Sequence, residues 1–518
     1  MNRHTFGDIV VTSHELATQS GLEILAKGGN AVDAAIAANA TLGVVAPETC
    51  GIGGDLFALV HRPGDVRPIT LNASGPAGSN VRSDHLTGPT IPITDPASVT
   101  IPGCVRGWEW LSSDLGSLSL DQVLRPAIDL ARNGFPASAE MSASLTARSE
   151  QLAPQPSAQG LYVDGQPPQP GTMIKRSQLE QTLGRIASDG AAGFYEGSVA
   201  GDMSEAVGGF ITLEDLAAYR PEWVQPISLD VFGHTGWTVP PNSQGYLTLA
   251  TARIFELSDP PADPEDPAHV HLMIEAYRAV AARRDDLLSD PRTAADHEEL
   301  LGEELLSYLA GQLDRRRAGI WPSPNPVIGG TTYLSVVDRA GIGVSLIQSN
   351  FHGIGSGIGA GTSGFFLHNR GAGFTLTKGH RNELSPGKRP AHTLSPTLWT
   401  HNGALSLILG TRGGHQQPQI LAQMAAHLLY LGLSPAEAQD IPRWTTAEFG
   451  RETVSSVTVE SDMPARIVEG LRELGHSVEF STGRVGGWGP VAAIRVTKSG
   501  LRTGAADRRV ATASAGVR

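Results

Sequence analysis

The sequence predicts a globular protein that combines α-helices with short β-strands, the α+β class. Two patterns support this class: apolar residues recur at helical spacing behind Ser, Thr and Asn capping residues, and other apolar runs are short and alternating. The 61 glycines and 35 prolines are spread through these segments without forming a repeat, which is typical of a fold rich in tight turns. With 518 residues, the chain can bury a substantial core in one large layered domain or in two to four average ones.

The first half of the chain is predicted to open with two helices. The capping-box pair Thr12 and Glu15 predicts a helix through Leu25, and Asn30 caps a second one over residues 31–45. This second run is almost wholly small and apolar, so we expect it to be buried on most sides. The further predicted elements are strands at 56–61 and 69–73, mainly helical structure over 98–219, a hairpin at 227–232 and 237–239, a helix through 255, and a helix at 269–288.

The second half is predicted to begin with a β-hairpin at residues 331–338 and 344–348, joined by a turn at Asp338-Arg339-Ala340-Gly341. The tail over 505–518 is small and polar, which predicts disorder. Between them the patterns predict strands at 405–409 and 492–496, and helices at 416–431 and 464–474.

Composition argues against several classes of partner. The formal net charge of −13 argues against nonspecific nucleic-acid binding. The N-terminus has no apolar segment and no run is long enough to cross a bilayer, so a cytoplasmic protein without a membrane partner is expected. The cysteines, Cys50 and Cys104, lie in no CxxC or Cys/His cluster, which disfavours a disulfide framework or a structural zinc site.

We find no motif for a cofactor or a metal. A GxSxG elbow, an HExxH helix and a Walker loop are all absent from the sequence. The glycine-rich loop at 353–359 lacks the βαβ context of a dinucleotide site. His269 and His271 lack acidic or cysteine partners nearby, so core or surface histidines are a better interpretation than metal ligands. We therefore expect neither a metal nor a cofactor.

Thr331 is the candidate nucleophile. A threonine hydroxyl needs a base beside it, and a threonine at the start of a chain supplies that base with its own α-amine. This chemistry requires cleavage of the chain after Gly330, a residue that tolerates strained backbone because it has no Cβ. Taken alone, the sequence Gly329-Gly330-Thr331-Thr332 is more often an ordinary Gly-Gly turn that leads into a hairpin. Acyl transfer also needs an oxyanion hole, and the glycine-rich turn at 410–414, between a strand and a helix, could present the required amides.

Several ordered segments together resemble the γ-glutamyltransferase family of N-terminal-nucleophile (Ntn) hydrolases over residues 7–496. Each segment alone is a weak signal, whereas their order and spacing are specific. They are Gly28-Gly29-Asn30-Ala31-Val32-Asp33-Ala34-Ala35, Gly51-Ile52-Gly53-Gly54-Asp55, Pro240-Pro241-Asn242-Ser243-Gln244-Gly245, Thr331-Thr332 through Val336-Val337-Asp338, Gly387-Lys388-Arg389-Pro390, and Gly413-Gly414.

The resemblance implies a four-layer αββα sandwich, the Ntn-hydrolase fold, and autocatalytic cleavage before Thr331. Residues 1–330 would form a large subunit and residues 331–518 a small one, which remain associated as a heterodimer. Whether two such heterodimers pair stays open. The resemblance further implies that Gly413 and Gly414 form the oxyanion hole and that Ser349 takes the place of a threonine that hydrogen-bonds the nucleophile.

The substrate pocket departs from the family pattern. The Arg and Glu pair that holds a substrate α-carboxylate falls on Asn72-Ala73, and the acid that holds the α-amine falls on Gly373. The family's Asn beyond the hairpin falls on Phe351, and its paired serines fall on His392-Thr393. A binding site without these charged side chains should bind the free α-amine and α-carboxylate of a γ-glutamyl substrate poorly. Other arginines that could hold a carboxylate instead are Arg370, Arg82 and Arg412.

The sequence therefore predicts a self-processing N-terminal threonine amidohydrolase or acyltransferase that cleaves γ-glutamyl or related carboxy-acyl amides through an acyl-enzyme on Thr331. The sequence at residues 348–351, 369–374 and 389–393 differs from the usual family pattern. It resembles a cytoplasmic branch of the family that includes oxamate amidohydrolases. A small-amide amidohydrolase of the oxamate type, with little transferase activity, is thus one alternative. An unprocessed, non-catalytic member of the family is another.

Overall fold

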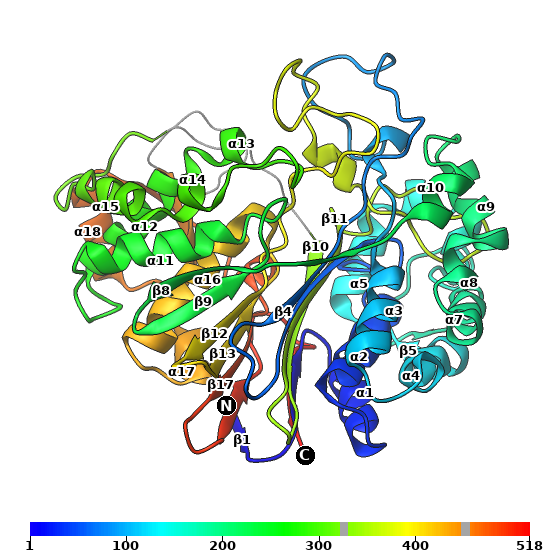
Figure 1. Cartoon of the computed structure of the whole chain (residues 1–518), viewed down its shortest axis with the longest axis horizontal. Helices are drawn as coiled ribbons and strands as arrows, with labels where there is room; N and C mark the ends of the chain where they lie inside the picture. Colours follow the sequence, from blue (N-terminus) through cyan, green and yellow to red (C-terminus); the bar gives the residue numbers. More distant parts are fainter. Residues whose placement is uncertain (322–329, 447–455) are drawn as a thin grey trace.

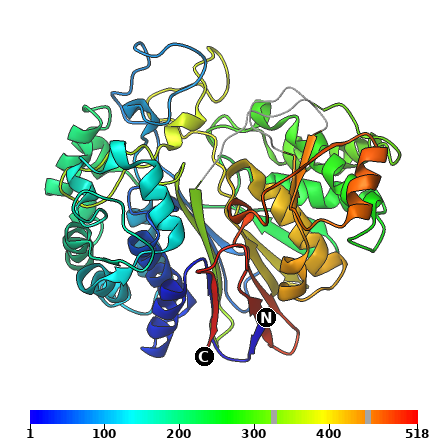
Figure 2. The ribbon, with the colours of Figure 1, turned by 180° about the vertical axis from the view of Figure 1, so that it is seen from behind.

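The computed structural model describes residues 1–321, 330–446 and 456–518. Two seven-stranded antiparallel sheets pack face to face, and helices cover the outer face of each (Figure 1). The architecture is the four-layer αββα sandwich that the sequence resemblance implied. The N- and C-termini lie close together at one end of the sandwich, also when the molecule is seen from behind (Figure 2).

Both sheets mix strands from before and after residue 330. The first has the order β19-β2-β10-β11-β3-β4-β7. Its strands are β2 (Ile9–Thr12), β3 (Asp55–His61), β4 (Ile69–Ala73), β7 (Glu222–Val224), β10 (Gly330–Val337), β11 (Gly343–Phe351) and β19 (Ser514–Val517). The second has the order β1-β18-β17-β13-β12-β9-β8. Its strands are β1 (Asn2–Thr5), β8 (Ile227–Val231), β9 (His234–Thr238), β12 (Thr397–His401), β13 (Ala404–Gly410), β17 (Ala492–Val496) and β18 (Arg502–Ala505).

Helices from the first part of the chain cover the first sheet (Figure 1). They are α1 (Glu15–Ala26), α2 (Ala31–Val45), α3 (Cys104–Leu115), α4 (Leu120–Asn133), α5 (Ala139–Ala147), α6 (Ser149–Leu152), α7 (Ser177–Asp189), α8 (Ala192–Tyr195), α9 (Gly197–Ala206) and α10 (Leu213–Ala218). The second sheet is covered by α11 (Tyr246–Leu257), α12 (Pro267–Ala281), α13 (Arg284–Leu287), α14 (His297–Leu301), α15 (Glu303–Gly311), α16 (Gln417–Ala425), α17 (Pro435–Asp440) and α18 (Ala465–Glu473).

Alternation along the central strands builds separate cores on the two faces of the first sheet. Tyr333 and Val337 of β10 pack between the sheets, whereas Leu334 and Val336 pack under the helices. Every residue of α2 is buried, as its small apolar composition predicted. Small side chains let this helix lie between the sheet and the neighbouring helices α1, α3 and α4.

Most predicted elements are confirmed, with three exceptions. Helix α1 begins after His14, whose ring accepts the Leu16 N–H, so the predicted capping box at Thr12 is wrong. The single helix predicted over 269–288 is two, α12 and α13. The tail predicted to be disordered contains the last residue of β18 and all of β19, which adds to the edge of the first sheet by pairing with β2. Among the described residues, no helix is both long and apolar enough to cross a membrane.

The turn of the β10–β11 hairpin holds the start of α2. Asp338 is buried; its Oδ2 accepts the Ala31 N–H at 2.9 Å and its Oδ1 accepts the Ile342 N–H at 3.0 Å. One side chain thus satisfies a free donor of the first helical turn and closes the hairpin turn.

Replacing this side chain should destabilise the fold. We expect Asp338→Ala to lower the free energy of unfolding by about 1–3 kcal/mol, because the buried N–H of Ala31 and the half-buried N–H of Ile342 lose their acceptor. Asp338→Asn, which keeps one acceptor oxygen, should lose less. Urea denaturation measures the effect, with Asp84→Ala in an exposed loop as the control. Equal stability of Asp338→Ala and the control would contradict this role.

Candidate active site

Thr331, the predicted nucleophile, is the second residue of β10 and is only 1% exposed. It lies where the pairing of β10 with β11 is irregular: Gly330 is opposite Phe351, Thr332 is opposite Gln348, and the register shifts between them. Such a bulge re-aims the side chain at the shift and leaves it outside the regular ladder.

The Ser349 hydroxyl connects Thr331 with the peptide bond before it. Thr331 Oγ1 donates to Ser349 Oγ at 3.2 Å, and the Phe351 N–H donates to the same oxygen at 2.7 Å. Ser349 Oγ in turn donates to the carbonyl oxygen of Gly330 at 2.5 Å. A single hydroxyl therefore contacts the predicted nucleophile on one side and donates to the adjacent carbonyl on the other.

No side chain fits at position 330. A Cβ added to Gly330 would lie 2.7 Å from the nitrogen of Gly353 and 3.1 Å from the carbonyl oxygen of Glu48. Both obstacles are backbone atoms and cannot rotate away. The glycine before Thr331 is thus required by the close approach of two other loops.

The predicted oxyanion loop follows β13 and comes close to the start of β10. A Cβ on Gly410 would lie 2.2 Å from the ring of Tyr333, so the two sheets touch here. Gly413 and Gly414 have φ of +129° and +57°, which favour glycine. Among the described residues neither of their N–H groups has a hydrogen-bond acceptor, so both remain available as donors.

The loop at residues 240–245 is one of the ordered sequence motifs, and the sequence alone assigns it no role. It connects this region to the predicted substrate residues. The side-chain nitrogen of Gln244 donates to the carbonyl oxygens of both Thr393 and Gly414, each at 3.0 Å. Its side-chain oxygen accepts from Arg284 at 2.9 Å. Gln244 thereby ties the predicted oxyanion loop to the segment that contains His392 and Thr393.

Of the predicted substrate contacts, Asn72 and His392 are largely committed to other partners, and position 373 has no room for an acid. Asn72 donates to Asn242 Oδ1 at 3.0 Å and accepts both the N–H and the hydroxyl of Ser74, which leaves one amide hydrogen. His392 contacts Asp55 Oδ2 at 3.1 Å with Nε2 and accepts the Leu394 N–H with Nδ1. At Gly373 a Cβ would lie 2.8 Å from the carbonyl oxygen of Ala391, so an acid cannot occupy this position without a shift.

The remaining predicted contacts, Arg370 and Thr393, lie together. The Arg370 guanidinium covers the Phe351 ring at 3.6 Å from its centroid, and its Nη2 donates to Thr393 Oγ1 at 3.2 Å. Arg370 is 1% exposed. Burial lowers its pKa to about 9, although the nearby Asp55 acts in the opposite direction.

Asp55, which closes one of the ordered motifs, is a buried acid that sequence reasoning left without a role. Its Oδ1 accepts the Gly75 N–H at 3.1 Å, and its Oδ2 faces the rings of His392 at 3.1 Å and His368 at 3.6 Å. Burial raises the pKa of Asp55 to about 7, against the opposing effect of Arg370. It also lowers the pKa of His368 to about 3, so this imidazole is neutral.

Glu48 is a second buried acid without an earlier assignment, on the loop that limits space at Gly330. Its Oε2 has no hydrogen-bond partner among the described residues. Burial, reinforced by the charge of Glu140, raises the pKa of Glu48 to about 8. Neither Asp55 nor Glu48 could be identified from the sequence, because an acid after a glycine loop or a proline gives no sign of burial.

The histidines considered as metal ligands belong to the core. His269 and His271 are buried. His271, Glu275 and His476 come within 4.8 Å of one another, but Nδ1 and Nε2 of His271 already contact His476 and the Asp314 carbonyl, both at 2.8 Å. Glu275 accepts from Gly319 and Trp321, and Arg278 lies 3.4 Å from it. These contacts and the adjacent cation do not fit a metal ion.

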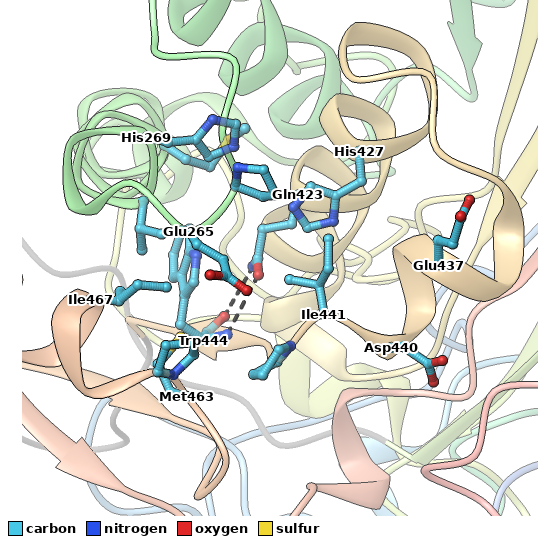
Figure 3. A pocket seen from close by; sticks show the side chains of 15 residues that line it. Glu265, His269, Gln423, His427, Glu437, Asp440, Ile441, Trp444, Met463 and Ile467 are labelled. Carbon is cyan, nitrogen blue, oxygen red and sulfur yellow. Dashed lines mark hydrogen bonds between the residues drawn. The ribbon is translucent and has the colours of Figure 1, made fainter.

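A pocket of about 340 Å³ lies between α12, α16, α17 and α18, and its lining includes neither Thr331 nor Arg370 (Figure 3). Its wall is mainly apolar, and it includes none of the predicted site residues. The labelled lining residues include His269, His427, Ile441, Trp444, Met463 and Ile467.

Comparison with known proteins places these features in context. The family model for gamma-glutamyltranspeptidase matches residues 17–517. The chain is 35% identical to the glutathione hydrolase-like YwrD proenzyme of Bacillus subtilis, over 100% of both chains. It is 36% identical to the oxamate amidohydrolase proenzyme of Klebsiella pneumoniae, over 98% of each. Among solved structures, a cephalosporin acylase from Bacillus halodurans has a TM-score of 0.92 at 31% identity, covering 100% of this chain and 96% of that one.

The raised pKa of Glu48 predicts a pH-dependent stability. Between pH 4.5 and about 8 the native state keeps a proton that the unfolded chain releases, so stability falls as pH rises. The loss is up to about 1.4 kcal/mol per pH unit. Glu48→Gln cannot ionise, so its melting temperature relative to the parent protein should increase between about pH 5 and about pH 8. Glu469→Gln, at an exposed position, should show a constant difference. A constant difference for Glu48→Gln as well would refute the shift.

Proposed function

Because the chain belongs to the γ-glutamyltranspeptidase family and is an amide-hydrolysing enzyme, we propose that it cleaves itself before Thr331 and then uses this residue as its nucleophile. The observation that carries the proposal is the bridge from Thr331 Oγ1 through Ser349 Oγ to the Gly330 carbonyl. The names of the two relatives, both proenzymes, support it.

Self-cleavage begins with attack of Thr331 Oγ1 on the Gly330 carbonyl carbon. The C–O bond forms, the C–N bond breaks, and the hydroxyl proton passes to the departing nitrogen, which becomes the α-amine of Thr331. Ser349 stabilises the developing oxyanion, because it already donates to this carbonyl oxygen. Water then hydrolyses the ester and leaves Gly330 with a carboxylate and Thr331 with a free hydroxyl.

The processed enzyme repeats this chemistry on a substrate amide. The α-amine of Thr331 takes the hydroxyl proton as Oγ1 attacks the amide carbonyl, and it then protonates the departing amine. The free N–H groups of Gly413 and Gly414 stabilise the tetrahedral oxyanion. Water, or an acceptor amine in a transfer reaction, releases the acyl group from Thr331.

The two fragments would remain associated after cleavage. In the first sheet β10 lies between β2 and β11, and in the second β13 and β12 lie between β17 and β9. Each sheet therefore joins strands of residues 1–330 to strands of residues 331–518, and separating the fragments would break ladder hydrogen bonds and expose both cores.

The substrate is a γ-glutamyl amide or a related carboxy-acyl amide. The missing space for an acid at Gly373, together with the uncharged Asn72-Ala73 pair, favours the second possibility. The similarity to an oxamate amidohydrolase points in the same direction. Ammonia release from oxamate, compared with hydrolysis of a γ-glutamyl anilide, distinguishes an oxamate-type amidohydrolase from a γ-glutamyl enzyme.

Processing at Thr331 predicts two fragments on a denaturing gel, residues 1–330 and 331–518. N-terminal sequencing of the smaller one should begin Thr331-Thr332-Tyr333. Thr331→Ala should stay intact and inactive, whereas Thr331→Ser, which retains a hydroxyl, should still be cleaved. An intact, active parent chain would sink the proposal, and an intact, inactive one would favour the non-catalytic alternative.

The role of Ser349 predicts a graded effect on processing. Ser349→Ala removes the donor to the Gly330 carbonyl, so cleavage should slow by about 100-fold or more. Ser349→Thr keeps the hydroxyl and should be cleaved at a rate close to that of the parent. A time course of band conversion after purification measures both. Equal rates for the Ala variant and the parent would show that the bridge plays no part.

A further inference from the structure

We propose that Arg370, together with Thr393, binds a carboxylate of the substrate, and that the substrate is a monoamide of a dicarboxylic acid without an ammonium group. This inference rests on the proposed function, because it identifies the substrate class of the site at Thr331. It concerns which substrate charge Arg370 recognises, and it can fail while self-processing and amide hydrolysis both hold.

The first observation is a buried cation with an unused donor. The Arg370 side chain is 1% exposed, its Nη2 donates to Thr393, and its Nη1 has no hydrogen-bond partner among the described residues. A guanidinium has five N–H donors arranged to grip a carboxylate. A buried charged donor without an acceptor is costly, so this nitrogen is suited to an anionic ligand.

No internal carboxylate neutralises this cation by direct contact. Within the described parts of the chain, no ion pair involves Arg370. The acid whose charge acts on it is Asp55, which accepts the Gly75 N–H with Oδ1 and contacts His392 with Oδ2. Since burial also raises the pKa of Asp55 to about 7, the positive charge of Arg370 is only partly offset at neutral pH.

Two chains of contacts connect Arg370 to the reacting groups. On one side its guanidinium covers the Phe351 ring, and the Phe351 N–H donates to the same Ser349 oxygen that Thr331 contacts. On the other side Thr393, which accepts from Arg370, is tied through Gln244 to the carbonyl of Gly414. Arg370 is thus connected, through intervening residues, to both the predicted nucleophile and the predicted oxyanion loop.

The other arginines proposed from the sequence do not offer a comparable donor. Arg412 is held by the carbonyl oxygens of Gly486 and Gly489 and forms a 2.7 Å ion pair with Glu140. Arg82 is exposed, and a surface guanidinium in water gains little from one carboxylate. Of the three, Arg370 alone combines burial with an unpartnered nitrogen.

Among the described residues a substrate ammonium has no comparable partner. Glu48 has an unpartnered Oε2, but burial raises its pKa to about 8, so this acid is mainly uncharged at neutral pH. Position 373 has no room for an acid, and Asp55 is already occupied. Arg370 and Arg284 both contribute positive charge here, and each lowers the affinity for a second cation. A free amino-acid head, with its ammonium beside its carboxylate, is therefore disfavoured, whereas a carboxylate alone is complementary.

Matched amides test this preference on the processed enzyme. We expect ammonia release from oxamate, succinamate or glutaramate, whichever spacing fits, with a kcat/KM about 100-fold above that of the neutral diamide of the same length. L-Asparagine and L-glutamine are succinamate and glutaramate with an added ammonium. Each should be a poorer substrate than its partner without the ammonium. Neutral diamides that react as well as the monoamides, or amino acids that react better, would overturn the inference.

Variants assign the preference to the side chain. Arg370→Gln should lose about 100-fold in kcat/KM for the monoamide and little for the diamide, and Arg370→Lys should recover part of the loss. Arg185→Gln, at an exposed position, is the control. Equal losses on both substrates would assign Arg370 a structural role and contradict the proposal.

Two further readouts separate this proposal from the proposed function. Each variant is first checked for its two fragments, since failure to process would test Thr331 chemistry and not carboxylate binding. Calorimetry with succinate or glutarate on the processed parent and on Arg370→Gln then measures binding without turnover. Binding to the parent alone supports the inference, whereas equal binding, or none to either protein, refutes it.

Discussion

The antiparallel pairing of β10 with β11 is the constraint on which the rest of the site depends. β11 also pairs with β3, so the hairpin is held in the interior of its sheet. The pairing brings Ser349 beside Thr331, although 18 positions separate them in sequence. The hairpin turn holds the start of α2 through Asp338, and its inner face meets β13 at Tyr333 and Gly410. A shift in this register would separate the hydroxyls of Thr331 and Ser349. It would also move α2 and the predicted oxyanion loop.

The region around this hairpin retains ionisable groups that packing alone would exclude. Glu48, Asp55 and Arg370 are all buried. Burial raises the pKa of both acids and lowers the pKa of the arginine, so each shift favours the uncharged form. Isolated buried charges cost free energy, so a protein usually pairs them fully or replaces them with apolar residues. Here the pairing is incomplete at Arg370 and at Glu48. Incomplete pairing next to a predicted nucleophile is a common property of sites whose missing partner is a ligand or a reacting group.

Local patterns predicted much of the fold, because they depend on neighbours in sequence. Asn30 caps α2 as predicted, and β4 covers the predicted residues. Patterns failed where distant contacts decide the outcome. Thr12 belongs to a strand because β2 pairs with β10 and β19, and the tail is ordered for the same reason. Both partner strands lie far from Thr12 in the sequence, so a pattern of neighbouring residues cannot predict the pairing.

By itself, the sequence determined the candidate nucleophile and the glycines around it. Ordered motifs identified the family, and Gly330, Gly413 and Gly414 are required by backbone positions that only glycine can occupy without strain. Tertiary structure alone distinguished three arginines that look alike in sequence: Arg82 is exposed, Arg412 is held by carbonyls and Glu140, and Arg370 keeps a buried donor free. The physical reason is that a charge acquires its function from burial and from its unmet partners, and both are set by residues far away in the chain.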